Sequence, residues 1–209
     1  MRFGPANRHR RSVRLPAFDY RSAGAYFVTI CTHERALIFD DPRTRRAVEL
    51  ALLSVGRYCR PASVDELVVM PNHVHAIIWL ATNDRIPVRD VGAQHTGHRN
   101  DTAPTDLHRQ AHEALAAACA APLRGRGQAR ARRVEAGSSG AVVRGFKSAT
   151  TKRINAMRNT PGVPVWQRKY HEHIIRDDGD LQRIRQYIRD NPAKWADDPD
   201  NPANIAKAP

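Results

Sequence analysis

VVMPNHVHAIIW, residues 68–79, is an apolar stretch interrupted by the turn-prone pair Pro71-Asn72. We therefore predict a strand on each side of a tight turn. Side chains alternate between faces along a strand, so His73 and His75 project from one face of the sheet. Two imidazoles in this arrangement can share a divalent metal ion, because histidine nitrogen is a common ligand for such metals.

A second stretch, DLQRIRQYIRDNP at residues 180–192, is predicted to form a helix. Tyr187 and Asn191 are four residues apart, so they lie one turn from each other on the same side of that helix. The amide oxygen of Asn191 is thus in a position to act as a third metal ligand beside the phenol. Since a residue before proline is disfavoured in helical geometry, Asn191-Pro192 should end the helix. Its buried stripe is predicted to consist of Leu181, Ile184 and Ile188.

The remaining periodicities predict an α/β (α+β) fold. Strands are expected at residues 26–32, 64–70, 73–80 and 166–175, and helices at 42–58, from Ser138 or Ser139 to about 158, and after Gly179. The first six elements follow the βαββαβ order of a ferredoxin-like palm, an antiparallel sheet with both helices on one face. The other face would be free for a ligand, and the helix that carries Tyr187 follows the palm.

The 209 residues are long enough for one domain with appendages. We expect a basic flexible arm at residues 1–16, a single domain at 17–198 and an unstructured tail at 199–209. Within the domain, residues 81–138 are predicted to be a flexible insertion rich in Ala and Arg, because they offer little apolar surface to offset the entropy of ordering.

The net charge of +13 and the pI near 10.6 indicate a polyanionic partner. No apolar run approaches the roughly 20 residues of a membrane span, and the arginine-rich N-terminus lacks an apolar signal core. We therefore expect nucleic acid as the partner, no membrane, and a cytoplasmic, nucleoid-associated location. The cysteines show no C-x-x-C spacing, which favours a reducing compartment and three free apolar side chains, Cys31, Cys59 and Cys119.

His-hydrophobic-His on a strand, followed by Tyr-x-x-x-Asn on a late helix, resembles the HUH single-tyrosine transposases. Among these, the chain is most similar to the REP-associated tyrosine transposases, which are linked to repetitive extragenic palindromes. The likeness covers most of residues 20–80 and 140–198. Besides the two stretches above, it includes RGFKSA at 144–149, VWQR at 165–168 and EHIIR at 172–176.

This resemblance implies a metal-dependent enzyme that cleaves and rejoins single-stranded DNA at a hairpin or palindromic repeat. Tyr187 would be the nucleophile and form a 5′-phosphotyrosine. The cofactor would be Mg²⁺ or Mn²⁺, held by His73, His75 and Asn191. Related enzymes act as monomers or as homodimers, and the sequence favours neither; the target DNA and an active or domesticated role stay open as well.

Basic residues along the chain are candidates for DNA phosphate contacts, which position a nucleic acid without specifying its sequence. They are Arg10, Arg11, Arg14, Arg144, Lys147, Lys152, Arg168 and Lys169.

Two other functions remain compatible with the sequence. The first is a ferredoxin-like module that binds nucleic acid without chemistry, such as a domesticated repressor. The second is a metal hydrolase that adds His171 and His173, a second His-x-His pair, to His73 and His75. For His171 and His173 we favour a structural or phosphate-facing role over metal binding.

Overall fold

The computed structural model describes residues 18–59, 62–81 and 137–205. Its centre is a four-stranded antiparallel sheet in the order β2-β3-β1-β4. The strands are β1 (Gly24–Cys31), β2 (Ala62–Met70), β3 (His73–Leu80) and β4 (His171–Ile175). This strand order, with a helix after β1 and another after β3, confirms the predicted ferredoxin-like palm.

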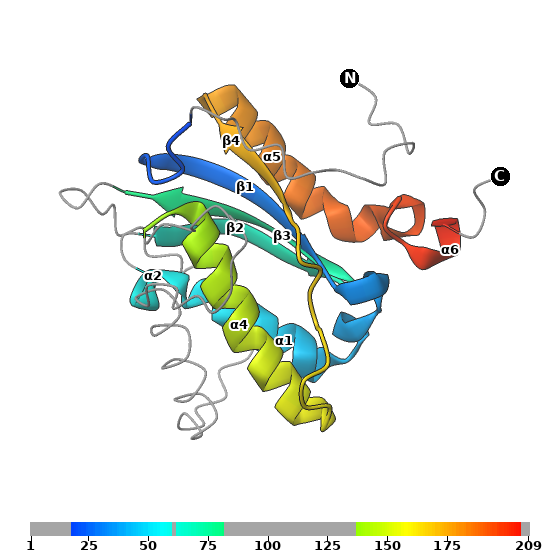
Figure 1. Cartoon of the computed structure of the whole chain (residues 1–209). Helices are drawn as coiled ribbons and strands as arrows, with labels where there is room; N and C mark the ends of the chain where they lie inside the picture. Colours follow the sequence, from blue (N-terminus) through cyan, green and yellow to red (C-terminus); the bar gives the residue numbers. More distant parts are fainter. Residues whose placement is uncertain (1–17, 60–61, 82–136, 206–209) are drawn as a thin grey trace, which may run out of the picture.

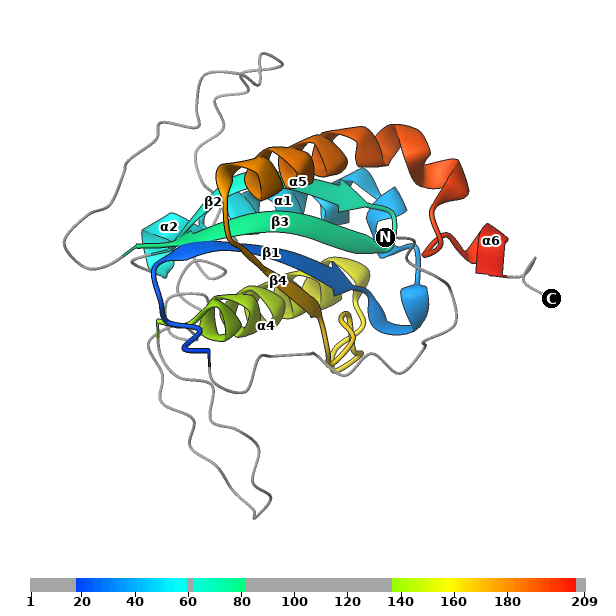
Figure 2. The same cartoon turned by 90° about the horizontal axis from the view of Figure 1, so that it is seen from above.

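Helices lie on both faces of the sheet and give three layers, as Figures 1 and 2 show. One face carries α1 (Pro42–Leu53), α2 (Val55–Tyr58) and α4 (Ser139–Arg158). The other carries α5 (Asp178–Asp190), which packs over β2 and β3. The expectation that this second face is bare was therefore wrong: the apolar side chains there are covered by the helix that bears Tyr187.

Strand alternation divides the core into two parts. The larger part packs β1 and β3 against α1 and α4, through side chains such as Val28, Val74, Leu52 and Phe146. The smaller part packs α5 on the opposite face and consists of Ala25, Phe27, Ile77, Leu181 and Ile188, with Val68, Ile175 and Ile184 at its margin. The predicted stripe of α5 is confirmed, because Leu181 and Ile188 are buried and Ile184 is partly buried.

Side-chain caps fix where the helices begin. Asp41 accepts a hydrogen bond from the backbone N–H of Arg43 at the start of α1, and Ser138 caps α4. For α5 the cap is Asp177, which accepts from the N–H of Asp180 at 2.8 Å, so the helix begins before Gly179 rather than after it. These caps satisfy backbone donors that have no partner within the helix.

The C-terminal end of α5 differs from the prediction. Asn191 keeps right-handed helical angles, with φ −56° and ψ −43°, although a proline follows. The chain continues as a 3-10 helix, η3 (Asn191–Asp197), which changes direction after α5. This tighter turn is what proline tolerates at the first positions of a helix.

Two further expectations need correction. The strand predicted at 166–175 is shorter, because Trp166 forms only an isolated bridge with Thr32 and buries its ring against α4, where its Nε1 donates to Thr150 Oγ1 at 2.9 Å. The segment after residue 198, expected to be unstructured, contains the short helix α6 (Pro202–Ile205). The arm at 1–16 and nearly all of the insertion, residues 82–136, lie outside the described residues.

Cys31 is free and buried, whereas Cys59 is disulfide-bonded. The interpretation of all three cysteines as free side chains was therefore wrong for Cys59. Within the described residues, no helix is long and apolar enough to span a membrane.

Candidate active site and metal centre

His73 and His75 lie side by side on the face of β3 that α5 covers. Their Nε2 atoms are 3.0 Å apart, and the side chains are 1% and 3% exposed. Two ligands at right angles, each about 2.1 Å from one metal ion, are separated by about 3.0 Å. The alternation of β3 therefore produces the predicted imidazole pair, with a spacing that suits a shared ion.

Asn72 fixes the orientation and the tautomer of His73. The Nδ2 of Asn72 donates to the backbone oxygens of Asp200 at 2.7 Å and Arg35 at 3.3 Å. Its Oδ1 consequently faces His73 Nδ1, at 2.8 Å, and must accept a hydrogen bond from it. The proton of His73 then resides on Nδ1, which leaves the lone pair of Nε2 available to a metal.

His75 is held by β1. Its Nδ1 lies 2.8 Å from Thr29 Oγ1, directly across the antiparallel pairing. Its ring stacks on Phe27, with 5.5 Å between the ring centroids. A hydroxyl accepts or donates equally well, so Thr29 supports His75 whichever nitrogen carries the proton.

Burial keeps both imidazoles neutral near pH 7. It lowers the pKa of His73 to about 4, against a smaller opposing effect of Asp200. Burial and the neighbouring His73 also lower the pKa of His75 well below its usual value. Neutral imidazole is the form that binds metal, so no proton needs to leave before coordination.

Tyr187 projects from α5 toward this pair. Its hydroxyl lies 3.4 Å from His75 Nε2, and its ring meets those of His75 and Phe27 edge-on. Burial of the hydroxyl raises the pKa of Tyr187, and the amide of Asn191 partly opposes the shift. The phenol is therefore protonated near neutral pH, while the side chain as a whole remains 46% exposed and accessible to a large substrate.

Asn191 lies one turn beyond Tyr187 and is 4% exposed. Its Oδ1 has no hydrogen-bond partner in the described part of the chain. A buried amide oxygen without a partner is unfavourable unless another ligand satisfies it. Two neutral imidazole nitrogens and this oxygen match the donors that a divalent cation accepts, so the residues fit the predicted cofactor.

Asp198 is an acidic neighbour of the site that sequence reasoning missed. Its Oδ2 lies 4.0 Å from His73 Nε2, and burial raises the pKa of its carboxyl. Local patterns gave no signal for it, because Asp198 follows the helix in a segment that looked unstructured. Only the turn after η3 brings it back toward β3.

His171 and His173 do not complete a four-histidine centre. His173 Nε2 pairs with Asp180 Oδ2 at 2.8 Å and so ties β4 to α5. His171 shares a row of the sheet with Thr29 and His75. Across the residues that the structure covers, no three His, Cys, Asp or Glu side chains are grouped to hold a metal. The arrangement thus disfavours the metal hydrolase.

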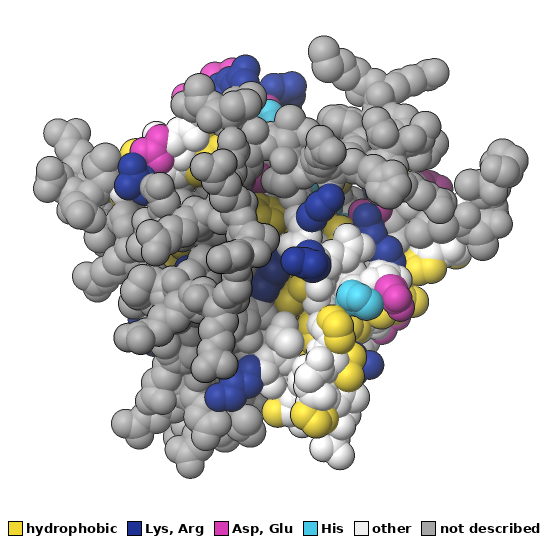
Figure 3. Space-filling view, in the orientation of Figure 1, with side chains coloured by type: hydrophobic (Ala, Val, Ile, Leu, Met, Phe, Trp, Pro, Cys, Tyr) yellow, Lys and Arg dark blue, Asp and Glu magenta, His cyan; other side chains and the backbone are white. Residues whose placement is uncertain are grey.

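The predicted DNA-contact residues have different surroundings. Arg168 and Lys169 are exposed on the segment that leads to β4, where Figure 3 shows Lys and Arg side chains gathered, and Lys152 is exposed on α4. Lys147 instead directs its ammonium inward, donating to the backbone oxygen of Gln167 at 2.8 Å. Arg144 is half-buried on α4.

The structure therefore does not support a phosphate contact for Lys147, because its ammonium group donates to a backbone oxygen of the protein. The remaining predicted contacts, Arg10, Arg11 and Arg14, lie outside the described residues.

No protein-family model matches the chain. An uncharacterized protein of Haemophilus influenzae is 30% identical over 201 residues, spanning 91% of this chain and 92% of the relative. A REP-associated tyrosine transposase bound to a REP hairpin is similar in structure, with 17% identity and a TM-score of 0.44 over 82% of this chain and 68% of that one. A candidate transposase from Deinococcus radiodurans has 13% identity and a TM-score of 0.37, over 81% and 91% of the respective chains.

Proposed function

Because the chain belongs to the same family as the uncharacterized Haemophilus influenzae protein, we propose a function from the chemistry of its own site. The protein is a transposase that cleaves and rejoins single-stranded DNA through a covalent bond to Tyr187. One observation carries this proposal: the hydroxyl of Tyr187 lies 3.4 Å from Nε2 of His75, one of two adjacent buried histidines whose pKa values burial lowers.

His73, His75 and Asn191 would hold the metal ion. Mg²⁺ or Mn²⁺ bound there would supply Lewis-acid polarisation of a phosphate oxygen. The chain's own residues prepare the site: Asn72 and Thr29 orient the imidazoles, and α5 keeps bulk water from the sheet face beneath it.

The phenol oxygen of Tyr187 attacks the phosphorus of the scissile phosphodiester. A bond forms between phosphorus and the phenol oxygen, and the bond from phosphorus to the 3′ oxygen breaks. The phenol proton leaves to solvent and the departing 3′ oxygen takes up a proton, which gives a free 3′-hydroxyl and a 5′-phosphotyrosine. Attack by another 3′-hydroxyl on the phosphotyrosine reverses these steps and joins strands.

DNA as the substrate is supported by charge and access. The chain carries a net charge of +13, and Arg168 and Lys169 are exposed on the segment just before β4. The half-exposed Tyr187 is accessible to the phosphate of a flexible unpaired strand. The resemblance of the motifs around His73 and Tyr187 to those of the REP-associated tyrosine transposases implies hairpin-forming palindromic repeats as the expected targets.

The test is incubation of the full chain with end-labelled hairpin single strands and Mn²⁺, followed by denaturing electrophoresis. We expect a denaturant-resistant protein–DNA adduct that is lost in Tyr187→Phe and retained in Tyr58→Phe. Tyr58 lies on α2, on the other side of the sheet, and serves as the matched control. DNA binding without any adduct in the wild-type protein would favour a non-catalytic binding module instead.

A further inference from the structure

Asp198 has a nearly buried carboxyl group, with a side chain that is 10% exposed. It forms no ion pair with a Lys or Arg of the described residues, although Arg35 lies near enough to favour its charge. The neighbouring Asp200, by contrast, pairs with Arg35. A carboxylate largely removed from water is unfavourable unless a cation or hydrogen-bond donors compensate it, so a cation near Asp198 would be stabilised there.

The turn at residues 198–200 orients the carboxylate of Asp198 toward His73. Asp198 Oδ1 accepts a hydrogen bond from the backbone N–H of Asp200 at 2.7 Å, which fixes the plane of the carboxylate. The other oxygen, Oδ2, faces His73 Nε2 at 4.0 Å. That separation is too long for a hydrogen bond, so His73 does not satisfy it.

The turn itself is anchored to the metal centre. The backbone oxygen of Asp200 accepts from Asn72 Nδ2 at 2.7 Å, and the same amide holds His73 through its Oδ1. One side chain thus sets both the tautomer of His73 and the position of the turn that bears Asp198. The orientation of His73 and the position of the turn at Asp198 therefore depend on the same side chain, Asn72.

A divalent cation at His73, His75 and Asn191 would meet three neutral donors, yet Mg²⁺ and Mn²⁺ favour anionic oxygen. As the described side chains stand, no three His, Cys, Asp or Glu groups converge as direct ligands. Such ions keep several waters, and a carboxylate that accepts a hydrogen bond from one of them lies roughly 4–5 Å from the ion. Asp198 has the charge and the position for this role.

We propose that Asp198 is the anionic positioning residue of the metal centre, holding a water of the cation's hydration shell and balancing its charge. This inference rests on the proposed function, since it presupposes a cation at His73 and His75. Asp198 would raise the affinity for the metal without being a direct ligand.

The experiment measures Mn²⁺ binding to the full-length protein without DNA, by isothermal titration calorimetry and by the rise in melting temperature that Mn²⁺ causes. Asp198→Asn keeps an oxygen that can accept from the N–H of Asp200, so the turn persists while the charge is lost. Asp197→Asn makes the same change of charge on the exposed neighbouring residue and is the matched control. Equal melting temperatures in chelator would show that all variants fold alike.

We expect Asp198→Asn to bind Mn²⁺ about tenfold to a hundredfold more weakly, as for other residues that act through metal-bound groups. Asp197→Asn should match the wild type, and His75→Ala should not bind. Equal affinity of Asp198→Asn and Asp197→Asn, with His75→Ala still inactive in binding, would overturn the inference and leave the metal centre intact. Failure of the wild type itself to bind Mn²⁺ would overturn both.

Discussion

The hydroxyl of Tyr187 lies 3.4 Å from Nε2 of His75, although 112 residues separate them in the chain. The contact exists because α5 packs across the sheet face from which His75 projects, with Leu181 and Ile188 buried beneath the helix. Packing of an apolar stripe thus brings Tyr187, the proposed nucleophile, to the candidate metal centre, and the stability of α5 and the chemistry of Tyr187 can be tested separately.

Stability should depend on Ile188 and hardly on Tyr187. Ile188 is 1% exposed, so Ile188→Ala should lower the free energy of unfolding by about 2–4 kcal/mol. Tyr187→Phe keeps the ring contacts and removes only a part-buried hydroxyl, so it should change that free energy by about 0.5 kcal/mol or less. Urea unfolding followed by circular dichroism measures both; a large loss in Tyr187→Phe would mean that the hydroxyl is structural.

The two His-x-His pairs should behave differently. His75→Ala removes a proposed ligand and should abolish both Mn²⁺ binding and DNA cleavage. His173→Ala breaks only the partly exposed pair with Asp180, so it should retain both activities and lower the free energy of unfolding by about 0.5 kcal/mol. If cleavage fails in His173→Ala while the protein remains folded, the metal hydrolase becomes the better interpretation.

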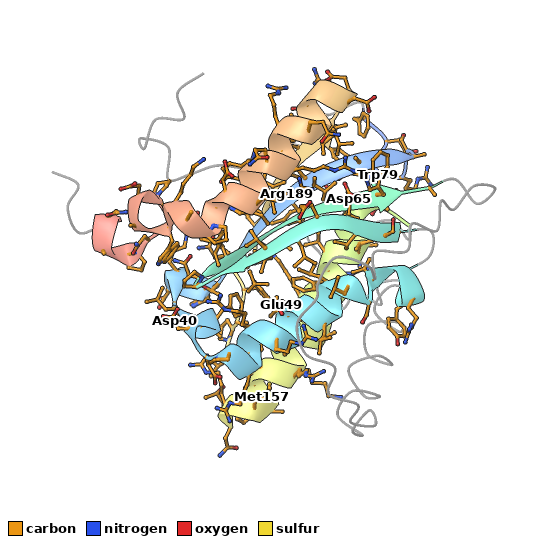
Figure 4. All side chains as sticks on the ribbon, turned by 180° about the vertical axis from the view of Figure 1, so that it is seen from behind. Asp40, Glu49, Asp65, Trp79, Met157 and Arg189 are labelled. Atoms are coloured by element: carbon orange, nitrogen blue, oxygen red, sulfur yellow. The ribbon has the colours of Figure 1, made fainter. Side chains whose placement is uncertain are left out.

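Two ion pairs fasten α5 to β2, and they should contribute unequally. Arg185 and Asp65 are only 14% and 18% exposed and approach to 2.7 Å, whereas Arg189, which pairs with Glu66, is 57% exposed. Figure 4 shows Asp65 and Arg189 along the line where the helix and the strand meet. Arg185→Met should lower the free energy of unfolding by about 1–3 kcal/mol and Arg189→Met by about 1 kcal/mol or less. Equal losses in urea unfolding would contradict this ranking.

Because of Lys147, the free energy of unfolding should increase as the pH is raised above about 8. Burial lowers its pKa from 10.5 to about 8 in the folded state. Between these values the unfolded chain holds a proton that the folded protein has released, so stability increases with pH. The free energy of unfolding of the wild type, relative to Lys147→Met, should rise by about 2–3 kcal/mol from pH 7.5 to pH 10.5. A flat difference would mean that the backbone oxygens keep the ammonium fully charged.

DNA affinity should fall with salt, and the exposed cations should set the slope. Lys169→Gln and Arg168→Gln should each reduce the slope of log K against log salt concentration by about 0.7–1, the value for one phosphate contact. Lys147→Met should leave the slope unchanged, because that ammonium bonds to the backbone. Fluorescence anisotropy with a labelled single strand provides the measurement, and an affinity independent of salt would exclude a basic binding surface.

Most of the local structure could be predicted from the sequence. The strand alternation that puts His73 and His75 on one face, the apolar stripe of α5 and a start of α4 at Ser138 or Ser139 all follow from residues within a few positions of each other. Backbone periodicity and capping are local, so a short window of sequence contains the information. The predicted start of α5 was wrong because Gly179 suggested a break in the helix, whereas Asp177 caps it and the helix begins at Asp178.

The sequence also indicated the residues of the candidate site, since His73, His75, Tyr187 and Asn191 form recognisable motifs. It did not show that Lys147 turns inward, or that the turn at Asp198 returns to His73. Those positions depend on where a helix crosses the sheet and on how the chain turns after η3. Contacts between distant residues arise from the packing of whole elements, so only the tertiary structure could decide them.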